Sequence, residues 1–136
     1  MTRLLLAYTG TLVAFALLDL AWLGYVARGF YQSQVGTLLR SPPRWWAALL
    51  LYAVYAAGVT GFVVVPALDG GSVASALAAG AAFGLVVYGT YDLTNLAVLR
   101  GWTTAAAAVD VAWGAAVSAA AAAAGFGLAR LAATAA

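Results

Sequence analysis

Four long apolar runs make up most of the chain, and shorter polar or glycine-containing connections separate them. Each run is long enough to cross a bilayer as a helix, at ~1.5 Å of rise per residue. The pattern predicts transmembrane helices over residues 4–25, 45–65, 72–99 and 103–127. Because the connections after the second and third runs are short, neighbouring helices should run antiparallel. We therefore expect a single membrane domain over residues 1–136, an all-α integral membrane protein folded as a four-transmembrane-helix antiparallel bundle.

A secretory signal peptide is the competing interpretation of the first run. The apolar part of such a peptide holds only ~7–15 residues, and the run here is longer. It also contains Asp19, and Trp22 and Tyr25 form an aromatic edge at its end. We therefore expect a retained transmembrane span.

The connection over residues 26–44 is the longest polar segment, and we call the end of the bundle that carries it side B and the opposite end side A. Its apolar residues recur at near-helical spacing, from Phe30 and Tyr31 to Val35. Both a short helix lying in the membrane interface and an ordered loop fit this spacing. Trp45, Trp46 and Trp102 are expected to be interface anchors at the ends of spans.

The other span ends are marked by turn residues and by composition. Pro66 is expected to close the second span, and residues 67–71 should form a tight turn. After Arg130 the tail should be frayed.

The composition supports a membrane protein and excludes several function classes. Of the residues, 66% are hydrophobic and 7% are charged, whereas soluble domains carry roughly 25% charged residues. The net charge of +2 is too small and dispersed for a nucleic-acid footprint, so no nucleic-acid partner is expected. The chain has no Cys and no His, which excludes disulfides and the usual ligands of zinc and haem. We expect no cofactor.

The third run carries an unusually polar stretch over residues 88–95, with a carboxylate, an amide, two phenols and two hydroxyls. A charged carboxylate inside an apolar span costs from a few to more than ten kcal/mol, so neighbouring helices should supply polar partners. One stripe leads to it, with residues four apart: Ala76, Gly80, Gly84, Tyr88 and Asp92. Small residues at this spacing let helices approach closely. The stripe therefore predicts a helix–helix interface that carries Asp92 inward, and Asp110, Gly114 and Ser118 form a similar stripe in the fourth run.

Four polar residues from four different spans fall at one predicted depth. Asp19, Tyr52, Asp92 and Asp110 each lie six to eight residues from the side-B end of their span. At ~1.5 Å per residue, this places all of them roughly 9–12 Å below that surface. We therefore expect one acid layer, which would open towards side B.

The candidate ligand-binding residues are the acids, aromatic residues and amide around this depth: Asp19, Trp22, Tyr52, Tyr55, Tyr88, Tyr91, Asp92, Asn95, Asp110 and Trp113. Several arrangements would offset the free-energy cost of burying three carboxyl groups. Some could be protonated and hydrogen-bonded, a cation could sit among Asp19, Asp92 and Asp110, Arg28 or Arg100 could reach in, or a polar ligand could bind. For the two Trp residues, packing or interface anchoring is the simpler interpretation.

Three hypotheses about function stay open. The first is binding or transport of a proton, a cation or a small polar molecule by the acid layer, which we favour. The second is an enzyme, or an enzyme's partner, acting on a lipid-like substrate by Asp and Tyr acid–base chemistry, which predicts a lipid-wide groove leading to the acids. The third is a structural subunit of a membrane complex, because buried polar networks can serve only to fix helix register.

The arginine distribution predicts the orientation. Side B carries four arginines, and side A carries Arg3, Arg130 and the amino terminus. The positive-inside rule therefore places side B in the cytoplasm and both termini on the non-cytoplasmic side. The lipid bilayer is the expected partner, together with a lipid or small-molecule ligand, and a homodimer is expected because four helices make a thin scaffold for a transport path.

Two sequence similarities complete the picture. Residues 19–22 and 110–113 share an Asp-x-Ala-Trp pattern, for which chance is the simpler explanation. The octapeptide over residues 88–95, with Gly80 to Leu85 before it, resembles the signature of a bacterial family of predicted membrane proteins of unknown function, domain-of-unknown-function family 2177. This resemblance covers nearly the whole chain. It implies a four-helix protein of the bacterial inner membrane and supplies no activity.

Overall fold

The computed structural model describes residues 1–134, which form helices and connections without any strand. Four helical stretches are long and apolar enough to cross a membrane: Thr2–Val26, Trp45–Gly70, Val73–Val98 and Thr104–Ala133. The predicted four-helix, all-α membrane architecture is confirmed.

Two of the spans contain a π-helical turn. The first consists of α1 (Thr2–Ala21) and the turn η1 (Trp22–Val26). The second consists of α3 (Trp45–Val59), the turn η3 (Thr60–Val64) and α4 (Val65–Gly70). The third and fourth spans are the single helices α5 (Val73–Val98) and α6 (Thr104–Thr134).

The long connection between the first two spans contains a short helix. This helix, α2 (Arg28–Val35), is followed by a single 3-10 turn, η2 (Gly36–Leu38). The connection is therefore helical where the sequence left a helix and a loop as alternatives. Tyr31 and Val35 form the buried face of α2.

The prediction that Pro66 ends the second span is wrong. Pro66 lies in the first turn of α4, and the helix continues to Gly70. A proline is tolerated in a first helical turn, where the backbone N–H would have no partner inside the helix. The π-helical turn η3 lies directly before α4, so the hydrogen-bond pattern changes from π-helical to α-helical just before the proline.

The predicted frayed tail after Arg130 is also wrong within the described residues, because α6 remains helical to Thr134. The segment is rich in alanine, which has the highest helix propensity. The guanidinium of Arg130 lies 5.2 Å from the ring centroid of Phe126, one turn earlier.

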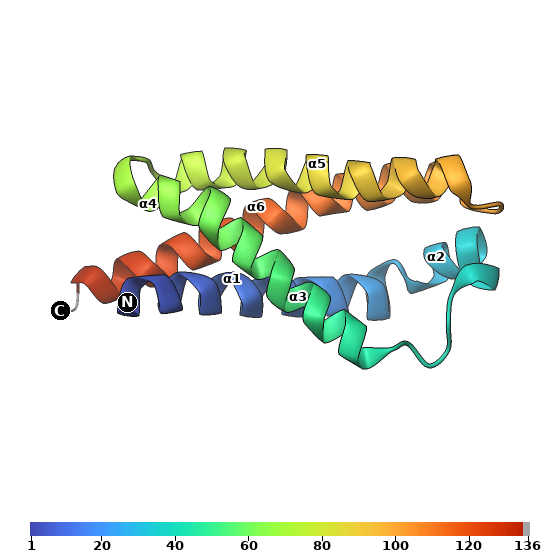
Figure 1. Cartoon of the computed structure of the whole chain (residues 1–136), viewed down its shortest axis with the longest axis horizontal. Helices are drawn as coiled ribbons and strands as arrows, with labels where there is room; N and C mark the ends of the chain where they lie inside the picture. Colours follow the sequence, from blue (N-terminus) through green and yellow to red (C-terminus); the bar gives the residue numbers. More distant parts are fainter. Residues whose placement is uncertain (135–136) are drawn as a thin grey trace.

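Helix α6 is the centre of the bundle. It packs along α5 on one side and along α1 on the other, and α3 crosses α1 diagonally (Figure 1). The start of α1 and the end of α6 lie at the same end of the molecule, side A (Figure 1). Towards side B, α3 diverges from α5.

Small residues bring α5 and α6 into close contact, as the stripe of Gly80 and Gly84 predicts. A Cβ atom at Gly84 would overlap the carbonyl group of Gly114 on α6, and one at Gly80 would lie 2.8 Å from the Ser118 carbonyl oxygen. Gly10 makes the same kind of approach between α1 and α6, where a Cβ atom would lie 3.0 Å from the Cα of Gly125. These contacts need the absence of a side chain.

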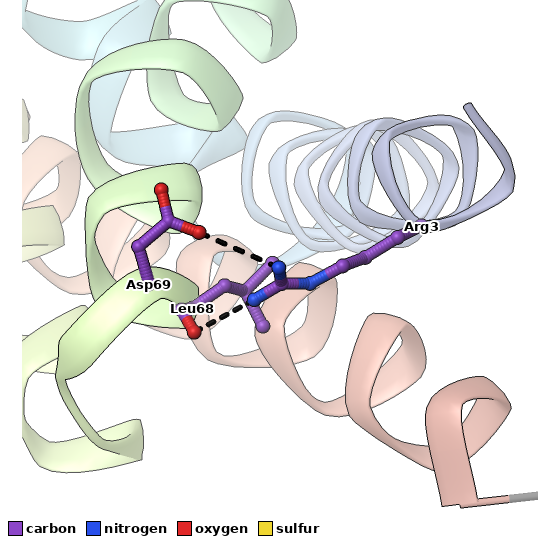
Figure 2. A network of polar contacts seen from close by, with 3 residues as sticks. All are labelled: Arg3, Leu68 and Asp69. Atoms are coloured by element: carbon purple, nitrogen blue, oxygen red, sulfur yellow. Dashed lines mark hydrogen bonds and ion pairs between the residues drawn. The ribbon is translucent and has the colours of Figure 1, made fainter.

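Polar groups fix the ends of the spans. The Ser72 and Ser75 side chains form a capping box at the start of α5. At side A, Arg3 donates to the Leu68 carbonyl oxygen at 2.7 Å and lies 3.4 Å from the Asp69 carboxylate (Figure 2). This pair is exposed, so it contributes little to stability, but it connects the start of α1 to α4.

Candidate functional site

Asp19 has a donor on each of its oxygens. It lies on α1 and is 7% exposed. The Tyr52 hydroxyl donates to Oδ2 at 2.8 Å, and the Trp113 indole donates to Oδ1 at 3.1 Å. We call Asp19, Tyr52 and Trp113 the Asp19 cluster. It joins α1, α3 and α6.

The two Asp-x-Ala-Trp segments meet in space. Trp22 and Trp113 stack with their ring centroids 4.4 Å apart and their planes 5° apart. Each Trp follows its own Asp by about one helical turn. Because α1 and α6 are antiparallel, Trp22 lies on the side-B side of Asp19, whereas Trp113 lies on the side-A side of Asp110 (Figure 1). The stacked pair thus lies between Asp19 and Asp110, so the sequence similarity has a structural counterpart.

The second cluster starts from Tyr31 on α2. The Tyr31 hydroxyl donates to Asp110 Oδ1 at 2.6 Å and accepts from the Trp22 indole at 3.3 Å. Its ring packs in a small apolar core with Ala27, Val35 and Ala106. Burial, together with the hydrogen bond to Asp110, raises the pKa of Tyr31 above its ordinary value.

Asp92 completes this cluster and is fully buried, with 0% exposure. Its Oδ1 accepts from the Trp102 indole at 3.2 Å, and its carboxyl group lies within hydrogen-bonding reach of that of Asp110. A hydrogen bond between two carboxyl groups requires a proton on one of them. Among residues 1–134, Asp92 Oδ2 has no hydrogen-bond partner. We call Tyr31, Asp92, Trp102 and Asp110 the Asp92–Asp110 cluster.

Tyr88 lies between the two clusters. Its hydroxyl is within electrostatic reach of both Asp19 and Asp110. Its ring meets that of Tyr55 edge-on, with centroids 6.0 Å apart, and it passes so close to Gly114 that a Cβ atom there would overlap it. The Gly114 stripe on α6 therefore gives Tyr88 its position.

Tyr55 lies outside both acid clusters. Its hydroxyl is 2.6 Å from that of Ser118. Because Ser118 donates to the Gly114 carbonyl oxygen at 2.6 Å, Tyr55 is the donor in the first bond. This pair is a buried link between α3 and α6.

The predicted residues thus form two clusters instead of one acid layer. The polar partners of Asp19, Asp92 and Asp110 are Tyr and Trp side chains and a second carboxyl group. Across the described part of the chain, no group of three His, Cys, Asp or Glu side chains could hold a metal ion. The ion pair found there joins Arg3 and Asp69, so Arg28 and Arg100 do not neutralise the buried acids.

Tyr91 and Asn95 lie at the outer flank of α5. Tyr91 is 54% exposed, and its ring meets that of Trp102 edge-on at 5.9 Å. The Asn95 amide nitrogen is buried and lies beside the Tyr91 hydroxyl, one helical turn earlier in α5. Both therefore face a different environment from the acids.

Two members of the site were missed from the sequence, Tyr31 and Trp102. Tyr31 falls in the polar connection, and Trp102 has the position of an interface anchor. The spacing of Tyr31 and Val35 was the available signal, because it places the phenol on the same face of α2 as the apolar contact.

The family model described as Predicted membrane protein (DUF2177) matches residues 4–127. The chain belongs to the DUF2177 family. The match includes both clusters and the octapeptide over residues 88–95, and it confirms the family that the sequence resembles. No curated protein and no solved structure matches this DUF2177 protein.

Proposed function

We propose that this DUF2177 protein binds a proton at the Asp92–Asp110 pair and uses it in transport across the membrane. The close approach of the two carboxyl groups, within hydrogen-bonding reach of each other, is the observation that supports this. A hydrogen bond between them needs one proton for two acids, so the pair is able to take up and release that proton.

The surroundings of the pair support proton exchange over cation binding. The two acids lack a third carboxylate or imidazole ligand within the described residues. Asp92 Oδ2 is buried and receives no N–H or O–H donor from the described residues, so this oxygen is available to the proton that the pair shares. Intramembrane acids with such neighbours commonly mark proton relays.

Hydroxyl and carboxyl groups follow one another from side B into the bundle, although Tyr88 forms no direct hydrogen bond to Asp110 or Asp19 within the described residues. Tyr31 belongs to the connection at side B and contacts Asp110 directly. Tyr88 then lies between Asp110 and Asp19, and Tyr52 contacts Asp19. We propose that protons enter beside Tyr31 and pass the stacked Trp pair by way of Tyr88.

We further propose the bacterial inner membrane as the location of the protein, with side B in the cytoplasm. The four arginines at residues 28, 40, 44 and 100 support this orientation. A homodimer is our proposal for the assembled state, because four helices leave little room for an enclosed path.

Proton flux into liposomes tests the function. The purified protein is reconstituted around an entrapped pH-sensitive dye, and the decay of an imposed pH gradient is followed. We expect the wild type to dissipate the gradient faster than protein-free liposomes, and Asp92→Asn and Asp110→Asn to abolish this excess. The matched control is Asp69→Asn, which changes an exposed acid at side A and should retain it. A wild type no faster than empty liposomes, or unchanged flux in both buried-acid variants, would contradict the proposal.

A further inference from the structure

Four exposed arginines lie at side B, and no acidic side chain accompanies them on that surface. We call them the side-B arginines: Arg28, Arg40, Arg44 and Arg100. Asp69 lies at side A, and the other three acids of the chain lie in the two clusters inside the bundle. Among residues 1–134, no carboxylate pairs with a side-B arginine. Their charge is therefore available to an anionic partner from outside the chain.

Two of the side-B arginines lie on segments that contact each other. In the α5–α6 connection, a Cβ atom at Gly101 would lie 4.0 Å from the Leu38 side chain of η2. The same connection also hydrogen-bonds with α2 through side chains. Arg100 directly precedes Gly101, and Arg40 follows Leu38 by two residues. Because consecutive Cα atoms are about 3.8 Å apart, both arginines start close to this contact, and their long side chains can meet at one anionic group.

Exposed apolar side chains adjoin three of the side-B arginines. Leu39, Trp45 and Leu99 are exposed, and each is the direct neighbour of one of these arginines in the sequence. At the end of a span, this pattern places guanidinium groups at the level of the lipid headgroups and apolar side chains just below them. A free phosphate would use only the charges, whereas a phospholipid also covers the apolar neighbours. The pattern therefore favours an anionic lipid as the partner.

We propose that side B binds anionic phospholipids, with Arg40 and Arg100 holding the phosphate of one headgroup and the other two side-B arginines attracting further headgroups. Guanidinium groups pair with phosphate oxygens through charge-assisted hydrogen bonds, and basic residues close to a span end favour anionic headgroups. Neither the orientation of the chain nor proton binding at the Asp92–Asp110 pair requires this lipid preference, so it can be tested separately.

Electron paramagnetic resonance of spin-labelled lipids tests the preference. The full-length protein is reconstituted in phosphatidylcholine liposomes with a trace of phosphatidylglycerol or phosphatidylcholine that carries the label in one acyl chain, and the motionally restricted fraction gives the relative association constant. We expect phosphatidylglycerol to be preferred at ~0.01 M salt and less so at ~0.15 M, where the Debye length falls from ~30 Å to ~8 Å. Arg40→Gln and Arg100→Gln should each lower the preference by up to about fivefold, the effect of removing one arginine near the surface.

A side-A variant provides the matched control. Arg130→Gln removes one exposed arginine from the opposite end and should retain the preference. Sodium phosphate and sodium chloride at equal ionic strength should weaken the preference equally, because the partner is a lipid and not free phosphate. Circular dichroism checks that all variants fold. Equal association of the two lipids, an effect of Arg130→Gln as large as that of Arg40→Gln, or stronger displacement by phosphate than by chloride would overturn the proposal.

Discussion

Single residues explain how acids are tolerated in so apolar a chain. Each oxygen of Asp19 receives a hydrogen bond, one from Tyr52 and one from Trp113. Asp92 and Asp110 instead use each other, together with one donor each from Trp102 and Tyr31. The first arrangement supplies a donor to both oxygens of Asp19, whereas a hydrogen bond between two carboxyl groups needs a proton. The proposed proton binding is therefore placed at the pair.

Trp113→Phe should destabilise the bundle by removing one donor from Asp19. Hydrogen bonds between membrane helices contribute roughly 0.6–1.7 kcal/mol, and the loss of the indole stacking on Trp22 adds to this. We expect the free energy of unfolding in mixed detergent micelles to fall by about 1–2 kcal/mol. Trp46→Phe, at a site that is 68% exposed, should change it little. Equal effects of the two substitutions would show that the contact to Asp19 contributes nothing.

Tyr31 should make stability depend on pH in the alkaline range. Its pKa is raised in the folded protein, by burial first and then by Asp110. The unfolded phenol ionises near pH 10, at which the folded one stays neutral. The contribution of Tyr31 is therefore complete below about pH 10 and is lost as the pH rises above it, by at most ~1.4 kcal/mol per pH unit. Tyr31→Phe should flatten the fall in unfolding free energy above pH 10, and an unchanged slope would contradict the assigned environment.

The sequence predicts which acids lie inside the membrane spans better than it predicts the side chains that contact them. Asp19, Asp92 and Asp110 can be recognised in the sequence because an acid inside an apolar run is costly unless it has polar partners. Their depth also brought Tyr52 into the site. The stacking of Trp22 on Trp113 depends on how α1 crosses α6, and the use of Tyr31 depends on how α2 folds back. Neither follows from spacing within one helix.

At the scale of elements, glycine contacts decide which helices pair. Gly84 and Gly114 let α5 and α6 meet backbone to backbone, which brings Asp92 beside Asp110. The period-four stripe predicted this face correctly, because small residues at that spacing have few other uses in a span. The prediction that Pro66 ends the span was wrong, because a π-helical turn directly before α4 lets the helix continue through the proline.

Two glycines of α5 allow a matched test of this contact. Gly84→Ala should lower the unfolding free energy by about 1–3 kcal/mol, because the added methyl group overlaps the Gly114 carbonyl. Gly89→Ala meets no atom within 4 Å and should raise it by about 0.5–1 kcal/mol, the gain from alanine in a helix. Thermal unfolding in the same detergent measures both. If the two variants are equally stable, the close approach does not hold the pair together.

The interior of the molecule is more polar in the half towards side B. The Asp92–Asp110 cluster reaches side B through Tyr31, whereas the core towards side A is built mainly from Ala, Val and Phe. If side B faces the cytoplasm, as proposed, protons enter from the cytoplasm.

The absence of native cysteine makes the orientation directly measurable. Thr2→Cys places a thiol at side A and Thr37→Cys places one at side B, both at exposed positions. A membrane-impermeant maleimide added to intact cells without an outer membrane barrier should label Thr2→Cys at once and Thr37→Cys only after the membrane is opened. The reverse pattern would place side B outside.

Infrared spectroscopy of the carboxyl groups can detect the shared proton itself. A shared proton gives the C=O stretch of a protonated carboxyl group near neutral pH, which shifts on transfer to D₂O. We predict this band in the wild type and in Asp19→Asn, and its loss in both Asp92→Asn and Asp110→Asn, because each removes one member of the pair. A wild type without the band, or a band that survives both substitutions, would contradict proton binding at Asp92 and Asp110.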